Sequence, residues 1–464
     1  MNLVWFRNDL RLADHPALTH ATKNNENVLA LYIFNPKQHQ VHGESPQKYE
    51  FIKSHVKDLR KRLKKINIEL LVKSVPTFND VPAVLATVVE QFDINAVYFN
   101  RSYWLNEIQR DKAVIKQLQN SEIEVRQYHA NYLLPPGTVT KDNGEMYHVF
   151  TPYKNKYIER VKADYELPLS IPGELTDNKD LSAQVESESI LLEAINLDDH
   201  LSQLWPIGEA AANERLKAFV ADNDYDDERD YPAISGTSGL SPYFALGVLS
   251  AKQGLAHALK QHNEKAFSST WVSELVWRDF YNDLLTTYPQ LAKHQTFKSD
   301  AVDEWRDDDE LFEQWQQGKT GFPIVDAGMR QLKQEGWMHN RVRMIVASFL
   351  TKLCLIDWRK GEAHFMAHLL DGDLASNNGG WQWSSATGCD AAPYFRIFNP
   401  TTQSKKFDPD GTYIKTYVKE LVDVDVKKIH DPDKSTRDEC GYPQPAIDYK
   451  QARTNALDWF KARK

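Results

Sequence analysis

The sequence has few cysteines and no long apolar run. Its three cysteines, Cys354, Cys389 and Cys440, are too few and too widely spaced for a disulfide framework or a zinc cage, which favours a reducing compartment. No run of about 18 apolar residues and no basic-then-apolar leader is present, so we expect no membrane span and a cytoplasmic location. The first part of the chain lacks both G-x-G-x-x-G and Walker A motifs, which argues against a standard dinucleotide or P-loop site.

The overall composition is that of a globular protein of 464 residues, with 41% hydrophobic and 26% charged residues. These values exclude a disordered or low-complexity chain and predict two or three domains. The net charge of −9, taken alone, argues against a nucleic-acid partner. The 12 tryptophans, beside 20 Tyr and 20 Phe, are more than core packing readily explains.

The first part of the chain alternates strand and helix patterns. Strands are predicted at residues 2–6, 28–34, 68–73, 95–100 and 122–127, and helices at 16–23, 47–66, 81–92 and 106–119. Strands separated by helices form right-handed crossovers and a parallel sheet, whose sites lie at the carboxyl ends of the strands. We therefore expect a Rossmann-like α/β domain with a parallel five-stranded sheet over residues 1–130.

The rest of the chain is predicted to be helical after a long connection. Residues 131–205 contain Pro, Gly and acidic clusters and are expected to connect two domains. Helical periodicity then appears at residues 246–261, 270–287, 322–334, 341–355 and 362–370, so residues 206–464 are predicted to form a large all-α domain.

Charge is spread unevenly over the helical part. Residues 319–360 contain eight basic and three acidic residues, whereas residues 300–313 contain eight acidic residues and one Arg. The first stretch can form a basic face that meets phosphates, or an ordinary solvated helix surface.

One apparent metal motif carries little weight. His364 and His368 have a spacing that can chelate zinc, but no third ligand is evident in the sequence, so packing or surface histidines are favoured and no metal is expected.

Two motifs at the start of the helical part can serve a ligand. Residues 236–242 (GTSGLSP) precede a helical run and predict an N-cap that suits a phosphate, although every helix needs such a start. In residues 271–281, Glu274, Trp277 and Arg278 share one helix face and can read and stack on a flat ring. The alternative for this second motif is a Glu–Arg pair beside a core Trp.

Two later motifs can also either bind a ligand or be ordinary parts of a helix. Residues 336–344 (GWMHNRVRM) begin a helix on which Arg341 and Arg343 can neutralise phosphates and Asn340 can contact a base edge. Residues 371–383 (DGDLASNNGGWQW) are rich in acids, amides and glycines, a composition untypical of a core helix, and favour a site. Trp381 and Trp383 are two apart and point in different directions if this segment is helical.

Taken together, these motifs resemble the photolyase/cryptochrome flavoproteins, most closely the bacterial class I cyclobutane pyrimidine dimer photolyases. The resemblance includes residues 4–12 (VWFRNDLRL), 321–327 (GFPIVDA), 337–344, 371–383 and 394–400 (YFRIFNP), and it spans nearly the whole chain. It implies an N-terminal α/β antenna domain and a C-terminal helical domain that binds one FAD.

The resemblance also implies which residues contact the flavin. Asn377 would lie beside the reactive ring nitrogen, where an amide favours the anionic reduced flavin that repair requires. The other implied contacts are Tyr225, Thr237, Ser238, Gly239, Leu240, Ser241, Trp271, Arg278, Asn340, Asp371, Gly372 and Asp373.

The implied reaction is light-driven DNA repair by a deoxyribodipyrimidine photo-lyase. Excited reduced FAD donates an electron to a flipped-out dimer, the cyclobutane ring splits, and the electron returns; photolyases are a known case of base flipping. Glu274 would hydrogen-bond the dimer, and Trp277 and Trp383 would stack against it. The remaining implied lesion or DNA contacts are Arg229, Arg278, Tyr281, Asn340, Arg341, Met344 and Gln403.

Further residues match the family's electron path and its antenna pocket. Trp381, Trp358 and Trp305 match the tryptophan chain that reduces the flavin, whereas Trp337 and Trp459 are interpreted as ordinary packing residues. The antenna chromophore is expected to be methenyltetrahydrofolate, with deazaflavin as the alternative. Its matching residues are His42, Asn106, Glu107 and Lys293.

Three other functions compete with this interpretation. One is a light-independent electron-transfer flavoprotein, which would not need Glu274 and Trp277 facing a DNA cavity. A blue-light sensory cryptochrome is disfavoured by Asn377 and by the Glu274, Trp277, Met344 and Trp383 set. A six-four photolyase would have histidines where Asn340 and Met344 stand. We therefore expect a monomeric, bacterial-type enzyme acting on UV-damaged nucleoid DNA, without an obligate protein partner or a membrane.

Overall fold

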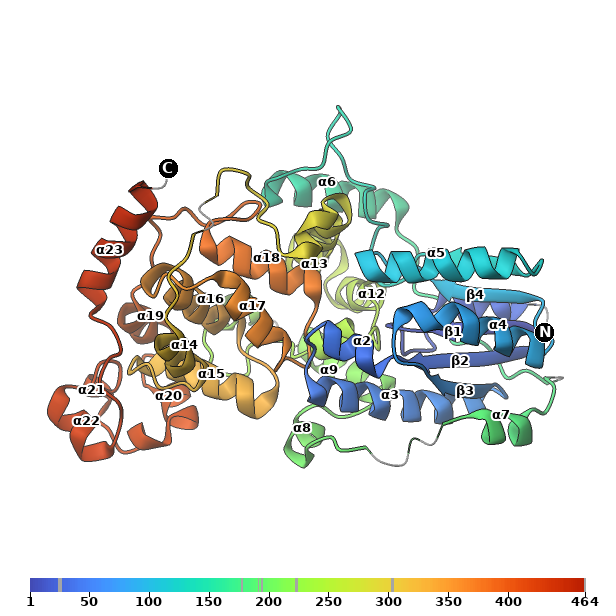
Figure 1. The fold of residues 1–464 in the computed structure, drawn as a ribbon, viewed down its shortest axis with the longest axis horizontal. Helices are drawn as coiled ribbons and strands as arrows, with labels where there is room; N and C mark the ends of the chain where they lie inside the picture. Colours follow the sequence, from blue (N-terminus) through green and yellow to red (C-terminus); the bar gives the residue numbers. More distant parts are fainter. Residues whose placement is uncertain are drawn as a thin grey trace. The chain divides into compact units, whose positions relative to one another are not determined.

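The computed structural model describes residues 1–23, 27–176, 178–190, 192, 195–221, 224–301 and 304–462. The chain forms two compact units, each described by itself (Figure 1). Unit 1 comprises Met1–Ala221 and Ser238–Ala292, and unit 2 comprises Asp222–Thr237 and Lys293–Lys464. The predicted functional domains, 1–130, 131–205 and 206–464, follow other boundaries and stay a prediction.

Unit 1 is built on the predicted five-stranded parallel sheet, which is confirmed. Its strands are β1 (Asn2–Phe6), β2 (Val28–Phe34), β3 (Glu69–Ser74), β4 (Ala96–Asn100) and β5 (Glu124–Tyr128). The strand order is β3-β2-β1-β4-β5, with Val4 opposite Ala30 on one side and Tyr98 on the other. The order reverses between β1 and β4, where open α/β sheets have their ligand crevice.

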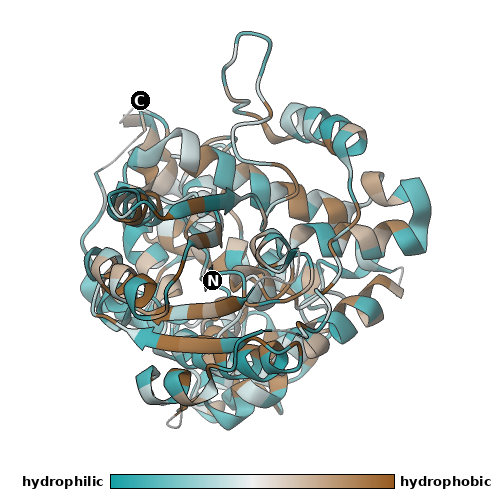
Figure 2. Cartoon of the chain, turned by 90° about the vertical axis from the view of Figure 1, so that its right-hand side faces the viewer, coloured by the Kyte–Doolittle hydropathy of each residue, from teal (hydrophilic) through white to brown (hydrophobic). Residues whose placement is uncertain are grey.

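Helices cover both faces of this sheet. Apolar residues of β1 to β4 form a core with helices α4 (Val81–Gln91) and α5 (Leu105–Gln119), and α3 (Pro46–Lys64) lies on the other face (Figure 1). The strands are mainly hydrophobic, whereas the helices around them carry hydrophilic segments (Figure 2). This pattern is typical of a parallel sheet buried on both faces.

The remaining elements of unit 1 are helical. They are α1 (Pro16–Ala21), α2 (Pro36–Val41), η2 (Phe78–Asp80), α6 (Phe150–Asp164), α7 (Ser182–Glu188), α8 (Asp199–Leu204), α9 (Glu209–Ala221), α11 (Ser241–Ala245), α12 (Ala251–His262), η3 (Asn263–Ser268) and α13 (Thr270–Thr287), followed by η4 (Pro289–Lys293). The predicted connector, 131–205, contains three of them; its residues 177, 191, 193 and 194 lie outside the described residues. Val185 of α7 joins the core of the sheet.

The described part of unit 2 is helical, with one isolated β-bridge between Arg306 and Ile356. Its elements are α10 (Tyr225–Glu228), α14 (Asp309–Gln316), α15 (Pro323–Glu335), α16 (Asn340–Ser348), the π-helix η5 (Phe349–Leu353), α17 (Trp358–Met366), α18 (Leu374–Ser385), α19 (Pro400–Phe407), α20 (Thr412–Tyr417), η6 (Lys419–Leu421), α21 (Val426–Ile429), α22 (Lys434–Cys440) and α23 (Tyr449–Ala462). The large all-α part predicted from the periodicity is confirmed.

Two predicted helices and one motif differ from the structure. The helix predicted at 246–261 begins only at Ala251, because Gly247 has a φ of 62° and its Cα lies so close to Asn8 that a Cβ would stand 2.1 Å from the Asn8 carbonyl oxygen. The helix predicted at 341–355 becomes a π-helix after Ser348. Conversely, most of the 371–383 motif is helix α18, which begins after the N-cap Asp373.

Candidate functional site

The predicted site residues are distributed over both compact units. Unit 1 holds those of helix α13, the loop residues 238–241 and most of the predicted antenna set. Unit 2 holds Tyr225, Arg229, Thr237, Lys293 and every predicted residue from Trp305 onwards.

Helix α13 presents the predicted lesion-contacting residues of unit 1. Its N-cap Ser269 accepts a hydrogen bond from the Val272 amide at 3.2 Å. Trp277 is half-buried and stacks face to face on Phe150 of α6, with ring centroids 3.5 Å apart and an interplanar angle of 8°. Tyr281 lies on the same side, 5.5 Å from Trp277 between ring centroids. One turn before Trp277, the half-buried Glu274 shares this helix face.

Arg278 fastens α13 to the chain that follows the sheet. Its Nη1 donates to the carbonyl oxygen of Asn131 at 2.9 Å, and its guanidinium lies 4.6 Å from the centre of the Tyr132 ring. The next residue, Asp279, is buried and accepts from the Leu133 amide at 2.9 Å and from the Tyr157 hydroxyl. These contacts fix the position of α13, and with it that of Trp277.

A second buried carboxyl lies one turn further along α13. Asp283 accepts hydrogen bonds from the Tyr153 hydroxyl at 2.7 Å and from the Gly137 amide at 3.1 Å. Burial raises the pKa of Asp283 to about 7, even though these two hydrogen bonds lower it, and nearby Asp279 raises it further. The chain therefore keeps a titratable acid inside the α6–α13 contact near neutral pH.

The loop before α11 differs from the predicted cap. The N-cap residue is Leu240, without a side-chain cap hydrogen bond, and Ser241 is the first residue of the helix. Gly239 has a φ of 57°, and a Cβ there would lie 2.4 Å from Nη1 of Arg215. The predicted N-cap within residues 236–242 therefore has no side-chain hydrogen bond, and the helix that follows is only five residues long.

In unit 2, helix α18 carries a connected set of amides. The side chain of Asn377 donates to the backbone oxygen of Glu362 at 3.0 Å, and that of Asn378 donates to the Glu362 carboxylate at 2.9 Å. Asn378 in turn accepts from Gln382 at 2.9 Å. The other carboxylate oxygen of Glu362 lies 2.9 Å from Nδ1 of His294, whose pKa is raised by this hydrogen bond.

The acids at the start of α18 have distinct tasks. Asp373 is the N-cap and accepts from the Ser376 amide at 2.8 Å. Asp371 is buried; its Oδ2 pairs with Nη2 of Arg343 at 2.8 Å, while its Oδ1 has no hydrogen-bond partner among the described residues. A buried acceptor without a donor is costly, and a ligand N–H or O–H would satisfy it.

The predicted DNA contacts of unit 2 are largely held by neighbours. Arg341 pairs with Asp230 at 2.7 Å and lies 4.5 Å from the centre of the Phe407 ring. Arg229 lies over the ring of Tyr225 at 5.2 Å. Asn340 is exposed, and Thr237, Met344, Trp383 and Gln403 are half-buried.

Most of the cations in the basic stretch at 319–360 are paired with carboxylates. Five of its eight cations have carboxylate partners: Arg330 with Glu420, Arg341 with Asp230, Arg343 with Asp371, Arg359 with Asp357, and Lys360 with Asp307 and Asp309. Lys352 is buried, and burial together with Arg396 and Lys298 lowers its pKa to about 7. The expected basic face is therefore much weaker than the sequence count indicates.

The three tryptophans of the predicted electron path belong to one core. Trp358 and Trp381 are buried, and Trp305 packs against the same cluster half-buried. Gly361, on the turn after Trp358, lies directly against Trp381, since a Cβ there would stand 2.2 Å from the indole ring. Arg306 donates its amide to Leu355 at 2.8 Å, which places Trp305 beside the segment leading to α17.

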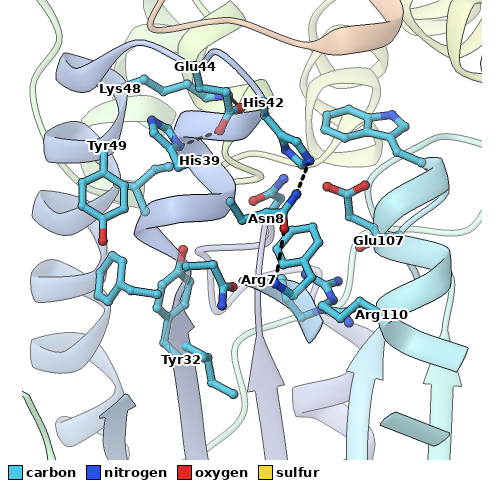
Figure 3. Close-up of a pocket in the computed structure, with 18 residues that line it drawn as sticks. Arg7, Asn8, Tyr32, His39, His42, Glu44, Lys48, Tyr49, Glu107 and Arg110 are labelled. Carbon is cyan, nitrogen blue, oxygen red and sulfur yellow. Dashed lines mark hydrogen bonds and ion pairs between the residues drawn. The ribbon is translucent and has the colours of Figure 1, made fainter. Parts of the chain in front are cut away.

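Two of the three predicted antenna residues of unit 1, His42 and Glu107, line a pocket at the carboxyl ends of the strands (Figure 3). His42, at the end of α2, lies 3.0 Å from the amide of the exposed Asn106, and Glu107 of α5 is buried in the wall. Burial raises the pKa of Glu107. The cavity has a volume of about 100 Å³ and opens to solvent at its mouth.

The sequence analysis missed most of this pocket. The additional wall residues lie at the end of β2, in the segments after β1, β2 and β4, or in neighbouring helices: Arg7, Asn8, Tyr32, Ile33, Phe34, Asn35, Gln38, His39, Glu44, Lys48, Tyr49, Ile52, Phe78, Ser102, Trp104 and Arg110. The strand ends alone could have indicated Arg7, Asn35 and Ser102. Lys293, the fourth predicted residue, is exposed in unit 2.

The paired histidines make packing contacts. His364 is 4.2 Å from His368 between ring centroids, lies 3.0 Å from the Gln316 amide, and has its pKa lowered to about 3 by burial. Among the described residues, no group of three or more His, Cys, Asp or Glu could hold a metal ion. Within the same ranges, no helix is long and apolar enough to span a bilayer.

Comparison with known proteins identifies the family. Residues 2–171 match the DNA photolyase family, and residues 271–462 match the FAD binding domain of DNA photolyase. Deoxyribodipyrimidine photo-lyases of Salmonella typhimurium and Escherichia coli are 43% and 42% identical to this chain, each covering 99% of it and 98% of the relative. The chain belongs to the DNA photolyase family.

Solved structures agree with this family. A class III photolyase from Agrobacterium tumefaciens matches with a TM-score of 0.89 at 34% identity, covering 100% of this chain and 97% of that one. A photolyase from Sulfolobus tokodaii, solved with two FAD molecules, matches at 0.81 and 30% identity over both full lengths. A Synechocystis cryptochrome matches at 0.83 and 29% identity, over 99% and 98%. The fold alone therefore does not separate repair from sensing.

Proposed function

We propose that this chain is a deoxyribodipyrimidine photo-lyase, an FAD enzyme that uses light to split cyclobutane pyrimidine dimers in DNA. The observation that carries the proposal is the full-length similarity to two deoxyribodipyrimidine photo-lyases at 42–43% identity. Residues 206–464 would then be the catalytic domain, residues 1–130 the antenna domain, and 131–205 the connector between them.

The residues present fit FAD. The unpartnered buried Oδ1 of Asp371 calls for a ligand donor, and the family match over 271–462 is to an FAD binding domain. We assign the flavin contacts to Tyr225, Thr237, Ser238, Gly239, Leu240, Ser241, Trp271, Arg278, Asn340, Asp371, Gly372, Asp373 and Asn377. When bound and reduced, FAD supplies a photo-excited electron.

Asn377 would contact the edge of the flavin ring through an amide, a group that does not titrate near neutral pH. The Asn377 amide nitrogen is oriented by the Glu362 carbonyl, which leaves its side-chain oxygen and second N–H for a ligand. An amide at this point cannot take up a proton near neutral pH, so it would favour a flavin that carries charge.

The flipped dimer would meet an aromatic wall with few polar anchors. Trp277 is already held flat by Phe150, so it can offer its other face to the lesion without losing further freedom. Glu274, one turn earlier on α13, would hydrogen-bond the dimer. We further assign lesion contacts to Trp383, Asn340, Arg341 and Met344, and DNA contacts to Arg229, Tyr281 and Gln403. Extruding a damaged base costs only about a few kcal/mol because its pairing is already weak.

Trp381, Trp358 and Trp305 would return electrons to the cofactor when it is oxidised. All three pack in or against one core, and Trp305 is the member of this path that is partly exposed. The carboxylates around Trp305 are shared with Arg306 and Lys360, so a positive charge on Trp305 gains less from the acidic run than the sequence indicates.

The antenna chromophore is proposed to be methenyltetrahydrofolate. The pocket in unit 1 combines the buried Glu107, which can accept from a pterin amide edge, with His42, whose ring is hydrogen-bonded to the exposed Asn106. Deazaflavin remains the alternative ligand. Absorption spectra and chromatography of the released chromophores distinguish the two.

A repair assay with two lesions separates this function from its competitors. The enzyme, acting as a monomer, is incubated under blue light with one oligonucleotide carrying a cyclobutane thymine dimer and another carrying a six-four product. We expect conversion of the first only. Conversion of the second only indicates a six-four photolyase, and conversion of neither, with reduced FAD bound, indicates a photoreceptor.

A further inference from the structure

Trp459, the tryptophan of the last helix, contacts the outermost member of the proposed electron path. The ring centroids of Trp305 and Trp459 are 5.5 Å apart, with an interplanar angle of 39°. Both side chains are half-buried, and both belong to unit 2. The sequence predicts that Trp459 and Trp337 are both ordinary packing residues. In the structure they have different neighbours. Trp337 instead meets His339, at 6.3 Å between ring centroids.

Trp305 is suited to pass a positive charge onwards. Its indole Nε1 is buried and has no hydrogen-bond partner among the described residues. An oxidised tryptophan normally loses this proton to a nearby base or to water, and that loss traps the charge. Since no described residue offers an acceptor to Nε1, we expect the oxidised Trp305 to stay a cation that can take an electron from a neighbouring indole.

We propose that Trp459 is a fourth electron donor, which reduces the oxidised Trp305 and presents the resulting charge at the surface. This inference rests on the proposed function, because it extends the path through Trp381, Trp358 and Trp305. One electron moves from the Trp459 indole to the Trp305 radical cation, so Trp305 becomes neutral and Trp459 becomes the radical cation. A thiolate in solution then gives one electron to Trp459, and two of the thiyl radicals that form combine as a disulfide.

Another tryptophan that touches the path cannot play this part. Trp315 lies 6.0 Å from Trp381 between ring centroids, but it is fully buried and its Nε1 donates to the Val346 carbonyl at 3.1 Å. A dissolved reductant cannot reach it. Trp459 is partly exposed on α23 and can meet one.

Radical trapping locates the end of the path directly. The full-length protein with oxidised FAD is illuminated with a nitroso spin trap, and peptide mass spectrometry maps the adducts. We expect the adduct on Trp459 in the wild type and its loss to background in Trp305→Phe. An adduct only on Trp305 in the wild type, or an adduct on Trp459 that persists in Trp305→Phe, overturns the proposal. The wild-type map needs no variant, so a folding defect does not weaken it.

Transient absorption supplies the second readout. In Trp459→Phe we expect the tryptophan radical to decay severalfold faster, because the charge then stays closer to the cofactor, and thiol-dependent photoreduction to slow severalfold. Trp337→Phe is the matched control and should behave like the wild type. Equal decay in Trp459→Phe and in the wild type overturns the proposal. Chemically reduced Trp459→Phe should still split dimers; if the chemically reduced wild type does not, the proposed function fails independently.

Discussion

Trp277 and Phe150 form a parallel stack at 3.5 Å between ring centroids, although they are far apart in sequence and lie on different helices, α13 and α6. The stack covers one face of Trp277 and restricts the rotation of its ring. Phe150 is thus a positioning residue for the proposed lesion wall, one that no sequence motif indicates.

Replacing Phe150 by Leu should weaken dimer recognition while preserving the fold. Leucine fills similar apolar volume, so we expect a loss of unfolding free energy of less than about 1.5 kcal/mol, whereas Phe150→Ala should lose about 3–5 kcal/mol. The measurement is the ratio of dissociation constants for damaged and undamaged oligonucleotide. A ratio in Phe150→Leu equal to that of the wild type would show that the stack does not position Trp277 for binding.

Asp283 should make stability depend on pH. Its pKa in the folded chain is about 7, above its ordinary value of 3.8, so the folded state holds a proton that the unfolded state has released. The unfolding free energy should therefore fall as pH rises from about 4 to about 7, by up to about 1.4 kcal/mol per pKa unit. Denaturant titrations across this range test it, with Asp283→Asn as comparison. A wild-type slope no steeper than that of Asp283→Asn would contradict the assignment.

Glu362 should control the titration of His294. The hydrogen bond between them raises the pKa of His294, so the stability it contributes is full below about pH 6.5 and is lost as pH rises through the raised value. In Glu362→Gln the pKa of His294 should fall, as read from its ring proton shifts by NMR. Glu313→Gln, an exposed carboxylate in the same unit, is the control. An unchanged His294 titration in Glu362→Gln would exclude the coupling.

A methyl group at Gly361 should disturb Trp381. Its Cβ would lie 2.2 Å from the indole, within a packed core, so we expect Gly361→Ala to lose about 1–3 kcal/mol and to lower the yield of photoreduction. Gly380 lies on α18 with no atom within 4 Å of its would-be Cβ, so Gly380→Ala should gain about 0.5–1 kcal/mol. Thermal unfolding of both variants provides the comparison. Equal effects of the two substitutions would contradict the close contact between α17 and Trp381.

The sequence predicted local structure better than contacts. The helix predicted at 270–287 has the same bounds in the structure, because Ser269 caps it and its periodicity is uninterrupted. The helix predicted at 246–261 failed at Gly247, because a distant backbone, that of Asn8, requires a glycine there. Periodicity carries no information on such an approach.

The sequence predicted which residue types belong to the candidate site, because residue types indicate chemistry. The motif residues could be named, but their partners could not. The sequence indicates a phosphate contact at Arg341, but in the structure Arg341 pairs with Asp230. Likewise, the sequence does not distinguish Trp459 from Trp337, whereas the structure shows Trp459 in contact with Trp305. These relations join residues that are remote in sequence, so no spacing reveals them.

Light-dependent repair is the most direct test of the central claim. The full chain, with its FAD chemically reduced and oxygen excluded, is mixed with an oligonucleotide carrying one thymine dimer, and chromatography follows the restored thymines under blue light and in darkness. The account predicts conversion in the light and none in the dark. Equal dark conversion, or none in the light although reduced FAD and the oligonucleotide are both bound, would contradict it.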